Sequence, residues 1–166
     1  MKKIILLAAF CVSVVMVISP DEALAQKETF DIASYTTPKG WKKQTSESAV
    51  QFTKEDAAKG IYCMITLFKA LPGTAISIEN FDLTWTSVVK EMVNVSTTPE
   101  MQPAATENGW EIQNGYAPFE KDGNKGIVIL VTASGFEKMV NMVILTNTEV
   151  YEKDMTSFLE SVSLNN

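Results

Sequence analysis

Two neighbouring segments in the last third of the chain, residues 126–133 (GIVILVTA) and 139–145 (MVNMVIL), constrain the fold most strongly. Side chains of a β-strand point alternately to the two faces of a sheet, and here both sets are mainly apolar. A strand that is apolar on both faces must be covered on both. The sequence therefore predicts two central strands, joined around Gly135 and Phe136, with a further layer on each side.

Two amphipathic helices are predicted to supply these layers, because apolar residues recur in two segments with the helical period of 3.6. Ser77 is placed to cap the first helix. Thr146 with Glu149, or Thr148 alone, is placed to cap the second. The apolar stripes are Ile78, Phe81, Trp85, Val88, Val89 and Met92 in the first helix, and Tyr151, Met155, Phe158, Leu159 and Val162 in the second.

The remaining strands are separated by tight turns, such as Asp122-Gly123, which makes sequence neighbours antiparallel. The fold class that follows is α+β, with a mostly antiparallel central sheet flanked by two amphipathic helices on opposite faces. A single domain is expected over residues 26–166. The further strands are predicted at residues 30–38, 41–45, 49–53, 61–71 and 109–119.

Residues 1–25 are predicted to be a cleaved signal peptide. Two lysines precede an apolar run at residues 4–18, Ser19-Pro20 ends the run, and Ala23-Leu24-Ala25 has the small–x–small pattern of a cleavage site. The run is shorter than the roughly 20 residues that cross a bilayer, so an uncleaved anchor is the weaker alternative. We expect export to the periplasm or the extracellular space, with no transmembrane segment in the mature chain.

Composition excludes several chemistries. The chain has a net charge of −6 and contains neither histidine nor arginine, so the usual general base, the commonest transition-metal ligand and the bidentate phosphate clamp are all missing. Nucleic acid is therefore not expected as a partner, and no cofactor or metal is expected. Cys63 is the one cysteine beyond the signal peptide, and its apolar strand predicts a buried, unreactive thiol.

Several short motifs occur in a recognisable order. They are the turn Pro38-Lys39-Gly40-Trp41, the strand Val50-Gln51-Phe52, the middle amphipathic helix, the apolar hairpin, and a last helix ending in Phe158, Leu159, Ser161 and Val162. This order resembles the fold shared by PsbP, the extrinsic protein of photosystem II, by a Ran-binding import factor and by the bacterial envelope protein DcrB. The resemblance spans nearly the whole mature chain. It implies a PsbP-like sandwich and a non-catalytic accessory or binding role, but it transfers no site residues.

Two aromatic groups are candidate binding sites. Trp41, beside Lys39, Lys42 and Lys43, could present its ring and positive charge to an anionic or carbohydrate ligand. The competing interpretation buries this ring in the core, where it would remove roughly 150–250 Å² from water. Trp110, Tyr116 and Phe119 lie on a predicted alternating strand and could form an aromatic platform, although aromatic residues on such a strand also serve as core.

The function that this pattern favours is that of an exported, non-enzymatic binding or accessory protein of a bacterial-type cell envelope. We expect its partner to be a protein or another envelope component, and the sequence leaves the oligomeric state open. The alternative is a small secreted hydrolase that uses carboxylates. Its candidate acids are those of the densest groups, Glu55, Asp56, Glu120 and Asp122.

Overall fold

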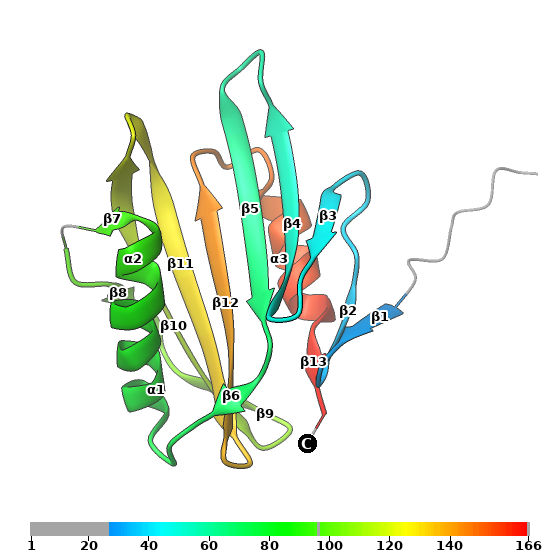
Figure 1. The fold of residues 1–166 in the computed structure, drawn as a ribbon, viewed down its shortest axis with the longest axis vertical. Coiled ribbons are helices and arrows are strands. Elements are labelled where there is room, and N and C mark those ends of the chain that lie inside the picture. Colours follow the sequence, from blue (N-terminus) through cyan, green and yellow to red (C-terminus); the bar gives the residue numbers. More distant parts are fainter. Residues whose placement is uncertain (1–26, 96, 166) are drawn as a thin grey trace, which may run out of the picture.

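The computed structural model describes residues 27–95 and 97–165. The signal peptide predicted at residues 1–25 lies outside these described residues. The described part forms a large sheet, a small sheet and two helical segments that lie on opposite faces of the large sheet (Figure 1). The predicted α+β class, mostly antiparallel with two flanking helices, is confirmed.

The large sheet has ten strands, in the order β3-β4-β5-β12-β11-β10-β7, with β6 beside β12 and with β8 and β9 beside β10. Its pairings are antiparallel. The small sheet has the order β1-β2-β13. The strands are β1 (Lys27–Phe30), β2 (Ala33–Thr36), β3 (Lys42–Thr45), β4 (Ala49–Asp56), β5 (Ile61–Phe68), β6 (Leu71–Pro72), β7 (Asn94–Val95), β8 (Glu100–Met101), β9 (Ala105–Glu107), β10 (Trp110–Lys121), β11 (Asn124–Gly135), β12 (Lys138–Thr146) and β13 (Ser163–Leu164).

The two apolar strands predicted from the sequence are β11 and β12, and they lie at the centre of the large sheet. They pair from Ile127 opposite Thr146 to Gly135 opposite Lys138. Phe136 and Glu137 form the two-residue turn between them, with φ values of 53° and 59°. Positive φ at both central residues is the requirement of a type I′ hairpin turn, whose twist matches that of the strands.

The first helical segment covers one face of β10 and β11, which we call the α1 face. It comprises α1 (Ser77–Thr84), a π-helical turn η1 (Trp85–Val89) and α2 (Lys90–Met92). Phe81, Trp85 and Val89 are buried in one cluster with sheet residues that include Val128 and Leu130. Phe81 and Trp85 stack on each other with 5.8 Å between ring centroids. This helical layer covers the apolar side chains that the central strands present on the α1 face.

The second helix, α3 (Glu152–Ser161), lies on the opposite face, which we call the α3 face, behind β4 and β5 in Figure 1. Phe158 is buried there between β2 and β4, with ring centroids 5.8 Å from Tyr35 and 5.0 Å from Phe52. Tyr35 and Phe52 are themselves 5.4 Å apart. The three rings anchor α3 between β2 of the small sheet and β4 of the large sheet.

The C-terminal end of α3 is tied to the small sheet. Strand β13 follows it directly and pairs with β2, Ser163 opposite Ser34 and Leu164 opposite Ala33. The backbone N–H of Thr36 donates a hydrogen bond to the Ser161 hydroxyl oxygen at 3.0 Å. The helix is therefore fixed on the β2 side, away from the β10 edge.

The predicted helix caps are wrong in both helices. Ser77 is the first residue of α1, with Ile76 at the N-cap, and the Ser77 hydroxyl donates to Glu111 Oε1 of β10 at 2.5 Å. Thr146 ends β12, and its hydroxyl bonds the Tyr62 carbonyl oxygen at 3.0 Å, while α3 begins at Glu152. Both hydroxyls donate hydrogen bonds to a strand instead of capping a helix. Because these partners are distant in the chain, the local sequence does not predict them.

We expect the change Phe158→Ala to lower the free energy of unfolding by about 3–5 kcal/mol, because it removes the central ring of the three-ring contact and leaves a cavity. Urea unfolding followed by circular dichroism measures this. Val150→Ala is the control, since Val150 is 69% exposed and its change should cost less than about 0.5 kcal/mol. Equal effects of the two changes would contradict the anchoring role of Phe158.

Candidate functional site

The α3 face is not completely covered, and one uncovered part is a cavity of about 330 Å³. It lies between strands β10, β11 and β12 on one side and the end of α3 with β13 on the other. Most of the lining is aliphatic. The apolar lining residues are Trp110, Ile112, Ile129, Val131, Ala133, Val140, Met142, Leu159, Val162 and Leu164.

The floor of the cavity is built by strand register. Ala133 of β11 lies opposite Ile112 of β10 and Val140 of β12. Two residues along, Val131 lies opposite Met142 on one side and Asn114 on the other. Residues in register share a face of the sheet, so these two rows form an almost wholly aliphatic surface.

The walls and rim come from the C-terminal end of the described chain and from the segment around the β9–β10 turn. Leu159 and Val162 form the wall at the end of α3, and Leu164 of β13 continues it. The polar lining residues are Glu107, Asn108, Asn114 and Ser163. Asn108 has φ 49° and Gly109 has φ 83°, so together they form a hairpin turn between β9 and β10. Asn-Gly is a strong hairpin signal, and it could have located this rim residue from the sequence.

Trp110 closes one end of the cavity and is only 2% exposed. Its ring packs edge-on against Phe136, with centroids 5.4 Å apart. Gly135 makes room for it, because a Cβ there would lie 3.2 Å from the ring and 2.8 Å from the Gly109 carbonyl oxygen. The indole N–H is buried and has no hydrogen-bond partner in the described part of the chain. Trp110 thus lines the cavity with its aromatic ring, while its N–H stays buried and unpaired among the described residues.

The predicted aromatic platform of Trp110 and Tyr116 does not form. Both residues lie on the same face of β10, but Tyr116 is six residues further along and does not line the cavity. A hydrogen bond with the Glu100 carboxylate, followed by burial, raises the pKa of Tyr116. Its position opposite Ile129 nevertheless places it beside the floor of the cavity.

The structure places Trp41 in the core, as the packing interpretation expects. The residue is 7% exposed, and its indole N–H donates to Asp154 Oδ2 at 3.1 Å. The Tyr151 ring lies 6.1 Å from the Trp41 ring. The indole therefore offers no open face beside the lysines.

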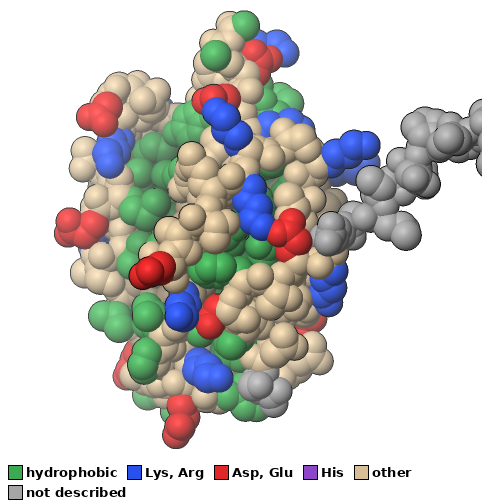
Figure 2. Space-filling model, turned by 45° about the vertical axis from the view of Figure 1, so that its right-hand side comes forward, with side chains coloured by type: hydrophobic (Ala, Val, Ile, Leu, Met, Phe, Trp, Pro, Cys, Tyr) green, Lys and Arg blue, Asp and Glu red, His purple; other side chains and the backbone are tan. Residues whose placement is uncertain are grey.

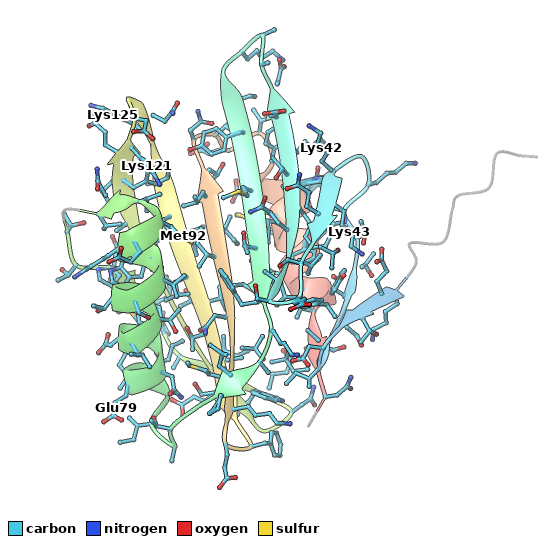
Figure 3. The ribbon with its side chains drawn as sticks, viewed as in Figure 1. Lys42, Lys43, Glu79, Met92, Lys121 and Lys125 are labelled. Carbon is cyan, nitrogen blue, oxygen red and sulfur yellow. The ribbon has the colours of Figure 1, made fainter. Side chains whose placement is uncertain are left out.

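The three lysines near Trp41 are exposed residues, and two of them lie beside acidic side chains. Lys43 forms an ion pair with Glu28, Lys42 lies 3.9 Å from Glu55, and Lys39 is exposed. Figure 3 shows Lys42 and Lys43 on the β3 side, far across the sheet from Lys121 and Lys125. Figure 2 shows lysine and acidic side chains dispersed over the visible face rather than gathered by sign. Ligand binding by these lysines stays a prediction.

The acids of the alternative hydrolase lie on two different hairpins. Glu55 and Asp56 end β4, and Asp56 pairs with Lys59 at 3.0 Å. Glu120 and Asp122 lie at the turn between β10 and β11, where Glu120 is 3.3 Å from Lys125. Within residues 27–95 and 97–165, no three His, Cys, Asp or Glu side chains are grouped to hold a metal ion.

Cys63 lies on the α3 face of β5 and is buried. Burial is the main cause that raises the pKa of its thiol to about 11. The thiol is therefore protonated near neutral pH, and it belongs to the core cluster of the α3 face. This is the position that its apolar strand predicted.

The described residues contain no helix with the length and apolar character needed to span a membrane. No family model matches the chain, and no curated protein matches it. The structure is similar to the solution structure of cyanobacterial PsbP (CyanoP) from Synechocystis, with a TM-score of 0.52 and 10% identity over 89% of this chain and 97% of that one. The chain therefore has a PsbP-like fold.

A second solved structure with this fold is a protein from Bacteroides thetaiotaomicron, crystallised at 1.50 Å resolution. The TM-score is 0.57 with 12% identity, and the match covers 86% of this chain. The chain spans about half, 49%, of that protein. At these identities the two likenesses show the fold alone.

Asp154 gives a prediction about acid stability. Hydrogen bonds from Lys54 Nζ (2.9 Å) and then from Trp41 Nε1 lower its pKa. Its stabilising contribution is therefore complete above the pKa of an unfolded Asp, about 3.9, and is lost as the pH falls through the lower pKa of the folded state. We expect Asp154→Asn to lower the urea midpoint at pH 7, and to lower it progressively less as the pH falls below about 3.9 and through the pKa of the folded state.

The matched control is Asp82→Asn, because Asp82 is exposed on α1. Its urea midpoint should stay close to that of the unchanged protein at pH 7. If Asp154→Asn and Asp82→Asn gave the same pH dependence of stability, the ion pair of Asp154 with Lys54 would not be stabilising.

Proposed function

We propose that the chain is an exported, non-enzymatic binding or accessory protein of the cell envelope, and that the cavity of the α3 face holds its ligand. The observation that carries the proposal is the cavity itself. Ligand sites typically enclose about 300–1,000 Å³, with mostly apolar walls and a few polar groups. The 330 Å³ cavity, with ten apolar residues and four polar ones in its lining, has this composition.

The lining favours a small apolar component of the envelope over a protein partner. A protein partner usually needs an exposed patch that buries about 800 Å² on each side. The cavity is instead a recess whose floor and wall come from different layers of the fold. An apolar molecule that enters it displaces water from the apolar lining. The free energy of binding then becomes more favourable by roughly 25 cal/mol for each Å² of apolar surface removed from water.

Two features support the remaining parts of the proposal. The charge and hydropathy pattern of residues 1–25 supports export. The separation of the candidate acids onto two hairpins, with lysine partners for Asp56 and Glu120, supports a non-enzymatic role. General acid–base catalysis needs such groups within hydrogen-bond reach of one substrate.

The test is binding of N-phenyl-1-naphthylamine, an uncharged dye that fluoresces in apolar sites. We expect the purified protein to bind the dye. Val131→Trp should weaken this binding about tenfold or more, because the added ring fills the cavity. The control is Leu83→Trp, which adds the same ring at a 55% exposed position of α1, on the other face. Circular dichroism and urea unfolding verify that both variants fold.

Two results would count against the proposal. Dye binding that Val131→Trp and Leu83→Trp leave equally strong would place the ligand outside the cavity. Hydrolysis of glycoside or ester substrates that is abolished by Glu55→Gln or Glu120→Gln would contradict the non-enzymatic role.

A further inference from the structure

A second hollow lies further along α3, towards its N-terminal end. We call it the outer groove. It has a volume of about 770 Å³, and Ile127 of β11 and Met155 of α3 line it. Ile127 precedes Ile129 by two residues and lies on the same face of β11, and Met155 precedes Leu159 by one helical turn. Ile129 and Leu159 line the cavity described above, which we now call the inner cavity. The two hollows therefore follow one another along β11 and α3, and we call them together the trough.

The trough is long and narrow. From Ile127 to Ala133 the strand rises about 20 Å, at roughly 3.3 Å per residue. Its apolar character extends outward beyond the inner cavity, because Ile127 and Val150 are 37% and 69% exposed and both line the outer groove. Exposed apolar side chains that lie together in a groove usually mark a site that a ligand or partner covers. The shape fits an extended chain better than a compact ring system.

The polar groups gather at the outer end. Lys125, Glu149 and Glu152 line the outer groove, whereas Glu107 is the only charged residue among those that line the inner cavity. Lys125 also lies 3.3 Å from Glu120, so acids outnumber the lysine at this end. An anionic head group would meet net repulsion there, while hydroxyl groups could donate to the carboxylates.

We propose that the ligand is a single-chain lipid with an uncharged, hydroxyl-bearing head group, its acyl chain in the inner cavity and its head at the outer groove. This inference rests on the proposed function and adds the class and the orientation of the ligand. A monoacylglycerol is the simplest molecule of this kind.

The experiment measures how monooctanoyl-, monolauroyl- and monopalmitoylglycerol displace N-phenyl-1-naphthylamine, below the concentrations at which they form micelles. We expect affinity to rise with chain length, because longer chains reach further along the trough. The methyl end of each chain is placed in the inner cavity, so only a long chain extends outward as far as Ile127. Ile127→Asp should therefore weaken the palmitoyl compound about tenfold or more, which corresponds to the burial of about two CH₂ groups, and should leave the octanoyl compound, whose chain ends before Ile127, unchanged. Val150→Asp is a second variant with the same expected pattern.

The matched control is Leu83→Asp, a change of the same type on the opposite face, which should alter no affinity. Laurate should bind more weakly than monolauroylglycerol. Tighter binding of laurate would overturn the uncharged head group. Equal affinities for the three chain lengths, with no effect of Ile127→Asp or Val150→Asp, would overturn the orientation while leaving the inner cavity as a binding site. Failure of the dye itself to bind would instead remove the proposed function.

Discussion

The need to cover both faces of β11 and β12 determines most of this structure. Neighbouring strands are about 4.8 Å apart and a helix with its side chains is about 10 Å wide, so one helix covers roughly two strands. The main path of the large sheet has seven strands. A single helix on each face therefore leaves part of that face to other elements. On the α1 face the helix lies over β10 and β11, whereas on the α3 face it lies towards β4 and β5.

Periodicity identified the elements that carry the core but not those at the margins. The two-sided apolar pattern of β11 and β12 and the two helical stripes were sufficient to predict the antiparallel sheet with helices on opposite faces. The small sheet was missed because β13 has two residues and no alternation to recognise. The π-turn from Trp85 to Val89 was also missed, because its apolar residues fit a helical period equally well. Such features are fixed by contacts between distant segments.

The candidate site could be predicted only in part for the same reason. Trp110 was singled out as an aromatic residue on an alternating strand, and it does line the cavity. Trp41 was singled out because lysines flank it, but its N–H is used by Asp154, which is 113 residues away in the chain. No local pattern indicates such a partner. The cavity depends on where α3 lies across the sheet, and an apolar stripe gives the face that a helix buries but not its lateral position.

That lateral position also explains why the trough stays open. Asp154 and Trp41 hold the first half of α3 on the β3–β4 side, and Phe158 with Tyr35 and Phe52 holds the second half there. A shift of the helix towards β10 would cover Ile129 and Val131, but it would separate the three rings, each of which buries roughly 150–250 Å². It would also break the pairing of β13 with β2. Leaving aliphatic side chains partly uncovered costs less free energy than separating the rings. Because stronger packing elsewhere keeps this surface uncovered, a ligand can bind to it without rearranging the core.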